Sequence, residues 1–303
     1  MAYNTSDSLL LSLTIGEKTI TIGGEASPYQ LLSSGFSGGE GADAVLSLLE
    51  HAQLDGSAVV SRRVAGRALT LLFEIADYAN RETHRTTLLS FFRPGADGVL
   101  TVKRICGGST AERSIGCTLS GCVTMTQETL SSYIRVRVPL YCADPYFSSE
   151  TDMLSLKKTS EPLLTFPLTV TADSGVTAGI VSVGDTMLLD NSGDVPAGFH
   201  LQLTASDRDS ENACVIINPT LTRAEDGAFL RILTTLNHGD TLTISTFPGA
   251  KYVLKNGETC LLFDRESTFF PLLCGRNTLR LTADASNGNL EAELSYRARW
   301  FGV

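Results

Sequence analysis

The stretch LYCADPYF, residues 140–147, is where the sequence divides. The run before it, residues 133–140, alternates apolar with polar side chains, which predicts the closing strand of a sheet. Because strand side chains alternate between faces, Arg135 and Arg137 lie together on the face opposite the apolar residues. Pro145 has no amide hydrogen for a neighbouring strand, so this strand cannot continue as a central one.

The residues that follow this strand must pack at its exit. Pro145 restricts Asp144 to extended backbone, and Tyr146 and Phe147 are large apolar groups. We therefore predict a packed hinge between two domains, formed by Asp144, Pro145, Tyr146 and Phe147. An Asp-Pro turn inside one larger domain is the alternative.

Length and composition set the outer bounds. A chain of 303 residues exceeds most single cores, so we predict two domains, residues 1–147 and 148–303. Hydrophobic residues make up 43% and charged residues 19%, which is typical of ordered globular proteins. The net charge of −9 argues against a surface that binds nucleic-acid phosphates, because such surfaces need clustered Lys and Arg.

The sequence also bears on the compartment. No stretch approaches the ~20 apolar residues of a membrane helix, and the first residues lack the basic start of a signal peptide. The seven cysteines include no Cys-x-x-Cys pair, so both a secreted disulfide framework and a zinc ribbon are poorly supported. We expect free thiols, no membrane insertion, no required nucleic-acid contact and assembly in a cytoplasm.

The first domain is predicted to be mostly β with one helix. Residues 9–15 and 18–22 form a hairpin, and the Gly- and Ser-rich run 33–41 is expected to be a flexible loop, with Phe36 either anchoring it or touching a partner. Residues 43–54 have helical spacing of apolar residues but also suit an extended segment, and both possibilities stay open. Further predicted strands cover residues 58–64, 67–75, 99–105, 117–125 and 133–140.

A single helix is expected between these strands. Asn80 can cap a helix from Arg81 to about Phe92, and residues 93–95, Arg-Pro-Gly, would stop it.

From residue 161 the pattern changes to short alternating segments with turn residues every eight to twelve positions. This spacing predicts an antiparallel β-sandwich, with strands running from residues 163–171 through to 290–301. The pair Asn256-Gly257 is the strongest hairpin signal in the chain.

A series of short motifs follows the hinge in a fixed order. They are NSGD at 191–194, NPTL at 218–221, LNHGDTL at 236–242, STFFPLLCGRN at 267–277 and YRARWFGV at 296–303. Together with ADPYF at 143–147, their order and spacing resemble the distal tail protein (Dit) family of long-tailed bacteriophages. Before residue 140 the resemblance depends on DGS at 55–57 and the strand after it.

This resemblance implies a fold and a role. The first domain would be a β-sandwich or split barrel and the second a galectin-like, jelly-roll-like sandwich. The chain would be a structural virion protein at the phage tail tip, forming a hexameric ring as the baseplate hub. Its partners would be further copies of itself, the tail tube protein and the tail-associated or tip protein, with a receptor-binding protein as a further candidate.

A ring needs one pair of complementary patches that is used repeatedly and closes on itself. Exposed strand edges of the first domain would form these patches, because their unpaired backbone groups can bind a strand of another copy. In an acidic chain, Arg62 and Arg63, or Arg135 and Arg137, are candidates for the positive half of that interface. Solvated strand faces are the alternative explanation for each of them.

A search for chemistry identifies no catalytic, cofactor-binding or metal-binding residues. The four histidines are scattered, and no serine elbow, phosphate-binding loop or dinucleotide fingerprint is present. Turn chemistry explains the acidic runs 190–194 and 207–211 better than calcium does. We therefore expect a protein that is not an enzyme.

Two other functions remain as alternatives. One is a carbohydrate-binding module that uses the sandwich. The other is a glycan hydrolase, since paired carboxylates from separate strands cannot be recognised in sequence. Trp300, the single tryptophan, is expected to pack against protein and not against a sugar.

Overall fold

The computed structural model describes residues 8–50, 55–127, 129, 132–149, 152–156, 159–162, 179–182, 185–205, 215–285 and 290–303. The chain forms two compact units, one of Met1–Ser149 with Arg299–Val303 and one of Glu150–Ala298. The predicted second domain ran to residue 303, whereas the structure groups the last five residues with the first unit. The predicted boundary at residue 147 stays a prediction.

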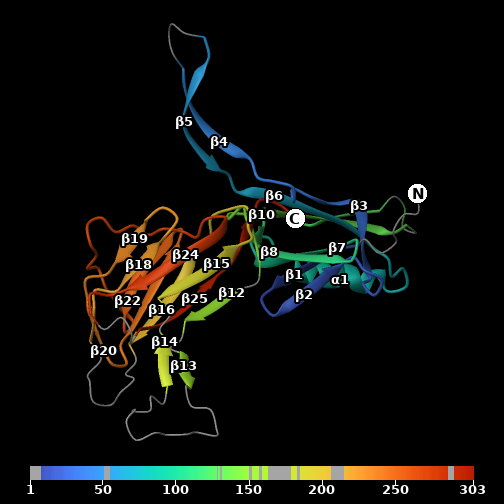
Figure 1. Ribbon diagram of the computed structural model, residues 1–303. Coiled ribbons are helices and arrows are strands. Elements are labelled where there is room, and N and C mark those ends of the chain that lie inside the picture. Colours follow the sequence, from blue (N-terminus) through green and yellow to red (C-terminus); the bar gives the residue numbers. More distant parts are fainter. Residues whose placement is uncertain are drawn as a thin grey trace, which may run out of the picture. The chain divides into compact units, whose positions relative to one another are not determined.

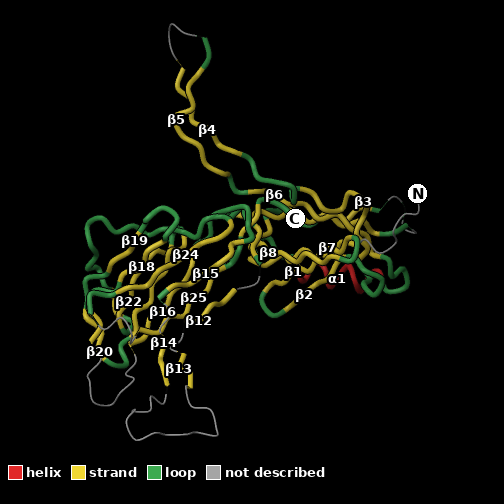
Figure 2. The backbone as a smooth tube through the Cα atoms, viewed as in Figure 1, coloured by secondary structure: helices red, strands yellow, loops and turns green. Residues whose placement is uncertain are grey.

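The first unit is built around a ten-stranded sheet (Figures 1 and 2). Its elements are β1 (Ser8–Ile15), β2 (Lys18–Ile22), β3 (Tyr29–Ser37), β4 (Ala44–Glu50), β5 (Ser57–Val64), β6 (Arg67–Ile75), α1 (Arg81–Phe91), β7 (Asp97–Cys106), β8 (Ser109–Leu119), β9 (Thr124–Thr126), β10 (Ile134–Cys142), β11 (Phe147–Ser148) and β26 (Arg299–Trp300). The main path of the sheet is β2-β1-β7-β8-β10-β6-β3, with β9, β11 and β26 attached to it and β4 and β5 outside it.

Strict alternation in β6 and β10 produces the core of this unit. Alternate residues of both strands are buried, among them Phe73, Val136 and Val138, and none of these three is exposed to solvent. The helix α1 adds Leu88 and Phe91 to the same cluster. Each such side chain contributes roughly 1.5–3 kcal/mol when fully buried, so the two strands and the helix stabilise one another.

The Gly- and Ser-rich run 33–41 is not the flexible loop that its composition predicts. Most of it belongs to β3, which pairs with β6 through a register shift between Leu31 and Phe36. Gly35 is buried there, and a Cβ at this position would lie 2.3 Å from the Leu72 carbonyl oxygen. Glycine therefore allows close strand approach at this position. The anchoring role of Phe36 is confirmed, because its ring packs against the core.

The predicted helix is confirmed, but its cap is not. Helix α1 ends at Phe91, just before the Arg-Pro-Gly stop, and Asn80 occupies the N-cap position without a side-chain bond to the helix. Instead, the Asn80 backbone and side-chain nitrogens donate to the Asp77 carboxylate at 3.2 and 3.0 Å. These bonds, with one from His84, hold the pKa of Asp77 below its usual range.

The structure decides one open choice and corrects two predicted strands. Residues 44–50 form a strand, which decides the choice for the described part of 43–54. The predicted strand 117–125 is wrong, because β8 ends at Leu119 and β9 is a separate strand. The predicted terminal strand 290–301 is split between the two units.

Two buried cysteines of the first unit predict an alkaline sensitivity. Burial raises the pKa of Cys117 from 9.0 to about 12 and that of Cys142 to about 11. Below the unfolded pKa of 9.0 both thiols are protonated in the folded and the unfolded chain, and their contribution to the free energy of unfolding is complete. As pH rises from 9.0 through the folded pKa values, the thiols of the unfolded chain ionise first, so this contribution is lost. We expect urea unfolding to give a lower free energy of unfolding at pH 10 than at pH 8.

Cysteine variants separate this effect from other alkaline titrations. A Cys142→Ala chain should lose less stability between the two pH values than the parent, whereas Cys274→Ala, at an exposed position, should behave like the parent. The same loss of stability in all three chains would show that the two thiols do not carry the effect.

The second unit is an antiparallel sandwich. Its strands are β12 (Asp152–Leu156), β13 (Thr159–Pro162), β14 (Gly179–Ser182), β15 (Thr186–Asn191), β16 (Phe199–Ala205), β17 (Val215–Ile217), β18 (Thr220–Arg223), β19 (Phe229–Arg231), β20 (Thr235–Asn237), β21 (Thr241–Phe247), β22 (Ala250–Lys255), β23 (Glu258–Thr259), β24 (Gly275–Thr282) and β25 (Leu290–Tyr296). A six-stranded sheet, β12-β25-β16-β21-β22-β23, and a four-stranded sheet, β15-β24-β18-β19, supply the two layers.

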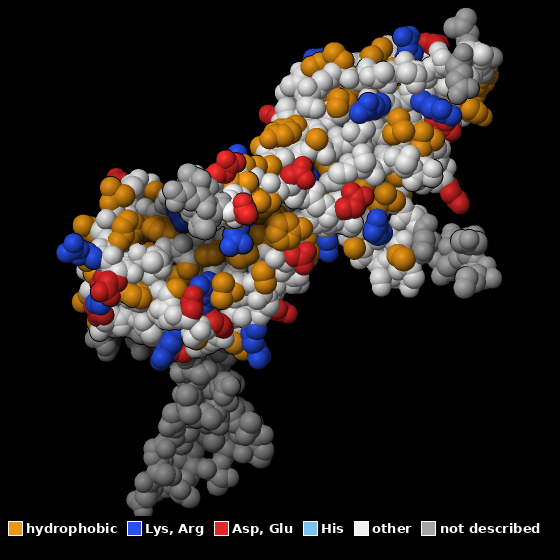
Figure 3. Space-filling model, turned by 90° about the horizontal axis from the view of Figure 1, so that it is seen from above, with side chains coloured by type: hydrophobic (Ala, Val, Ile, Leu, Met, Phe, Trp, Pro, Cys, Tyr) orange, Lys and Arg blue, Asp and Glu red, His pale blue; other side chains and the backbone are white. Residues whose placement is uncertain are grey.

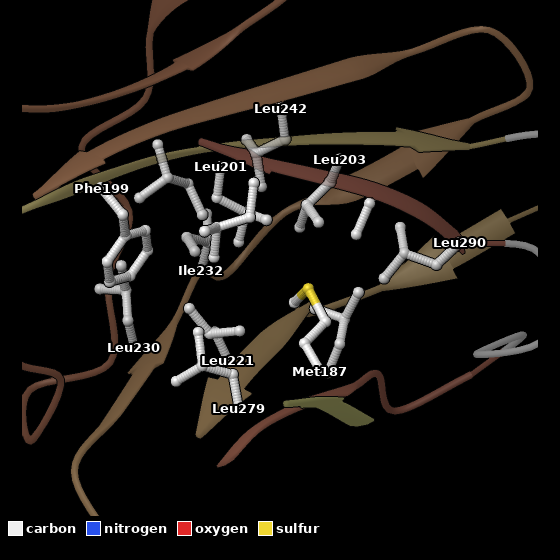
Figure 4. Close-up of a cluster of buried hydrophobic side chains, with 14 of the residues drawn as sticks. Met187, Phe199, Leu201, Leu203, Leu221, Leu230, Ile232, Leu242, Leu279 and Leu290 are labelled. Atoms are coloured by element: carbon white, nitrogen blue, oxygen red, sulfur yellow. The ribbon is translucent and has the colours of Figure 1, made fainter. Parts of the chain in front are cut away.

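The core of this unit lies between the two layers. Figure 4 shows Phe199, Leu201 and Leu203 of the first layer pointing toward Leu221 and Leu279 of the second. The predicted mainly-β fold is confirmed, with one helix among the described residues. At the Asn256-Gly257 hairpin both residues have positive φ, 51° and 85°, as the predicted tight turn requires.

Several predictions fall on residues outside those described. They are the strand 163–171, the acidic run 207–211 and the state of Cys214. Among the described residues, no helix has the length and hydropathy needed to cross a membrane.

Candidate assembly interface

Strands β4 and β5 form a sheet of their own that extends out of the first unit (Figure 1). We call residues 44–64 the arm. Every residue of β4 is exposed, and so are seven of the eight residues of β5. The described part of the arm therefore packs on nothing but its own partner strand.

The arm carries large apolar side chains on both faces. Leu48 lies opposite Val59 on one face, and Leu49 lies opposite Ala58 on the other. Six such side chains are 39–66% exposed: Val45, Leu46, Leu48, Leu49, Val59 and Val60. Isolated two-stranded hairpins are marginally stable in water, so an exposed ribbon of this composition favours burial against a partner.

The four predicted interface arginines fall into two separate places. Arg62 and Arg63 lie in the arm, opposite Leu46 and Val45 and hence on different faces. Arg135 and Arg137 lie on the exposed face of β10 in the ten-stranded sheet, where Arg135 is 4.0 Å from the Glu74 carboxylate. Exposed pairs of this kind contribute at most about 1 kcal/mol. The interface role of all four arginines stays a prediction.

The structure shows charge of both signs around these elements. On the face shown in Figure 3, lysines and arginines are interspersed with aspartates and glutamates, without a broad basic field among the residues drawn in colour. We therefore single out the arm by its exposed apolar side chains and not by its charge.

Residues 299–303, which we call the returning segment, close the first unit near the arm. Trp300 pairs with Phe147 and Arg299 with Ser148, so that β26 extends the sheet through β11. The Arg113 guanidinium lies 4.3 Å from the centre of the Trp300 ring, and Arg113 also donates to the Gly302 carbonyl oxygen. Trp300 thus packs against protein, as expected.

The predicted hinge residues contact this same segment within the first unit. Arg299 donates to both carboxylate oxygens of Asp144, and its guanidinium lies 4.5 Å from the centre of the Tyr146 ring. Pro145 and Phe147 are buried. Asp144 itself is exposed, so packing is shown for the other three residues, and the role of all four as a hinge stays a prediction.

Sequence reasoning missed the returning segment because its partners are remote. Arg67, at the start of β6, donates to the Phe301 carbonyl oxygen across 234 positions. The dense aromatic and basic composition of residues 296–301 is the signal that the sequence offers, and alternation alone predicts a single sandwich strand there.

Comparison with known families bears on the C-terminal part of the chain. Residues 193–300 match the sequence profile of the siphovirus-type tail component, C-terminal domain. These residues are similar to a siphovirus-type tail domain. The resemblance to distal tail proteins is therefore confirmed, although the profile of this tail domain does not extend over the arm.

One solved structure shares the fold over nearly the whole chain. The crystal structure of the SPP1 Dit protein, described as a paradigm of the hub adsorption apparatus in phages that infect Gram-positive bacteria, aligns with a TM-score of 0.61 at 11% identity, covering 95% of this chain and 98% of that one. A chain of the phage P2 baseplate in its activated conformation with Ca aligns with a TM-score of 0.43 at 9% identity, covering 96% and 97%. No curated protein sequence matches the chain.

The histidines and acidic side chains of the described residues do not assemble into a metal site. No group of three or more His, Cys, Asp or Glu side chains that could hold a metal ion occurs among the described residues. His84 contacts the Tyr29 hydroxyl and the Asp77 carboxylate, both at 3.2 Å, and His200 packs beside Phe247. Each of these histidines therefore has a structural partner.

Proposed function

We propose that the chain is a structural component of a phage tail tip, in which copies associate through the arm into a closed ring of six. The ring would join the tail tube to the tail-associated or tip protein and act as the baseplate hub, with a receptor-binding protein as a further partner. The proposed location is the virion tail tip, after assembly in the host cytoplasm. The proposed role is not enzymatic.

The observation that carries this proposal is the arm. Among the described residues, a projecting ribbon leaves apolar side chains on both of its faces exposed, so it favours docking on a different surface of another copy. Such a contact is heterologous, and repeated with a closing rotation it generates a ring. The tail domain at residues 193–300 and the fold shared with the SPP1 hub protein support placing this ring in a phage tail.

The two carbohydrate-related alternatives lack a supporting observation among the described residues. One face of Trp300, the residue most suited to stack on a sugar ring, is occupied by the Arg113 guanidinium. We therefore do not propose either carbohydrate-related function, and polysaccharide binding is measured only as an outcome of the experiment below.

Mass in solution tests the proposal. We expect light scattering across a concentration series to show a species near six times 32.4 kDa, and negative-stain images of it to show a central hole. A monomer at every concentration, both alone and with purified tail tubes, would contradict a hub role. Binding of host-wall polysaccharide by such a monomer would favour the carbohydrate-binding alternative instead.

A further inference from the structure

We infer that the returning segment, residues 299–303, positions the arm, so that association through the arm depends on this segment being seated. The inference rests on the proposed function, because it names what controls the proposed arm contact. It concerns the arm base, which we define as residues 38–43, leading into β4, and residues 65–67, leading out of β5. A backbone hydrogen bond of 2.8 Å from the Ala65 nitrogen to the Asp43 oxygen ties the two halves of the base together.

The returning segment contacts the first half of the arm base through backbone atoms. The Val303 nitrogen donates to the Gly39 oxygen at 3.2 Å. Gly302 lies so close that a Cβ added to it would be 2.8 Å from the Glu40 oxygen and 3.0 Å from the Gly39 oxygen. The two backbones are therefore in direct contact, and a side chain at residue 302 would push them apart.

Arg67 links the segment to both halves of the base. It belongs to the second half, and it donates to the Gly38 oxygen at 3.3 Å and to the Phe301 oxygen. Its side chain is almost entirely buried, at 3% exposure, with its guanidinium 5.0 Å from the centre of the Phe147 ring. A buried cation needs its acceptors, so removing the Phe301 oxygen leaves Arg67 without one of them and strains the base at this point.

The returning segment is also anchored in the body of the first unit, by which we mean the strands and loops outside the arm and its base. Arg113 of β8 donates to the Gly302 oxygen, Asp144 accepts from Arg299, and the Tyr146 and Phe301 rings meet edge to face at 5.4 Å. These contacts attach the segment to elements that do not belong to the arm. The segment therefore contacts both the body of the first unit and the arm base, and it fixes the base relative to the body.

The arm base is poorly suited to hold its own conformation. Four of its nine residues are glycines: Gly38, Gly39, Gly41 and Gly66. Glycine-rich backbone has many accessible conformations, and ordering it on association costs free energy that a prearranged base does not incur. A seated segment should thus favour association by ordering the arm in advance.

A pair of glycine variants tests this inference in the full chain. Gly302→Ala introduces a Cβ against the backbone of Gly39 and Glu40, whereas Gly116→Ala, in β8 and outside the arm base, introduces a Cβ with nothing within 4 Å. We expect amide hydrogen exchange at Ala65 and across residues 38–44 to become about tenfold faster in Gly302→Ala and to stay unchanged in Gly116→Ala. Association should weaken in the first variant alone.

A second variant covers the case in which alanine is accommodated at residue 302. A chain that lacks residues 299–303 should show the same faster exchange, and excess Arg-Trp-Phe-Gly-Val peptide should slow it again. Unchanged exchange at the arm base in both variants would overturn the inference. A parent chain that never associates would overturn the proposed function, and the exchange comparison would still decide whether the segment orders the arm.

Discussion

A chain carrying Leu48→Thr and Val59→Thr is expected to remain folded and to lose association. The two side chains lie opposite each other on one face of the arm and are 56% and 54% exposed in the single chain. Because they already face water, their replacement should change the free energy of unfolding by only about 0.5 kcal/mol. Threonine is β-branched and favours strands, so the arm itself should persist.

The expected effect on association is much larger. If both side chains are buried between copies, each replacement removes about 1–2 kcal/mol of apolar burial, which together weakens each contact roughly 30- to 1,000-fold. A closed ring uses the contact six times under our proposal, so the loss is compounded. Light scattering of parent and variant over the same concentration series measures this directly.

The matched control is Leu188→Thr in β15 of the second unit. Leu188 is 60% exposed and lies in a strand, so the control makes the same Leu→Thr change as at residue 48 without touching the arm. We expect the control to associate like the parent. If the arm variant associates normally while the control does not, the contact lies in the second unit and the arm proposal is wrong.

The elements that sequence predicted well are those whose pattern is local and one-sided. The strand 133–140 alternates cleanly because Val136 and Val138 face the core while Arg135 and Arg137 face water. The Asn256-Gly257 turn needs positive φ at both positions, which few other pairs allow. In each case the residue types alone carry the information.

Of the two strands of the arm, the predicted strand 58–64 is confirmed as β5, but β4 could not be assigned in this way. Period-two alternation identifies a strand only where one face is buried and the other is wet, and both faces of the arm are apolar and exposed. The same residues, Val45, Leu48 and Leu49, also match helical spacing, so the two patterns competed. What settles the choice is pairing with β5, since Ser47 lies opposite Ser61 and Leu48 opposite Val59.

The position of the returning segment could not be predicted from sequence for a different reason. Its place depends on Arg67, Arg113 and Asp144, which precede it by more than 150 positions, and no local pattern encodes such contacts. The four candidate arginines illustrate the converse limit. Sequence can show that Arg62 and Arg135 are on solvated strand faces, but not that one lies in the arm and the other in the main sheet.

Replacing Phe147 with alanine is expected to destabilise the first unit by about 3–5 kcal/mol, as for other fully buried aromatic side chains. Phe147 has no exposed surface, pairs with Trp300 through β11 and β26, and supports the buried Arg67 guanidinium with its ring. Burial already lowers the pKa of Arg67, so this cation would be left with a cavity in place of its aromatic neighbour.

Thiol labelling during urea unfolding reports on the first unit specifically, because its buried cysteines, Cys117 and Cys142, react only once that core opens. The control Tyr141→Ala changes an aromatic residue that is 47% exposed, and we expect it to cost less than about 1 kcal/mol. Equal, small effects in both variants would mean that Phe147 is not part of the core in solution. A large effect of Phe147→Ala alone would mean that the Phe147 side chain is part of the core of the first unit. Rotation about this residue would then remove the side chain from that core, so any hinge motion would have to begin after Phe147.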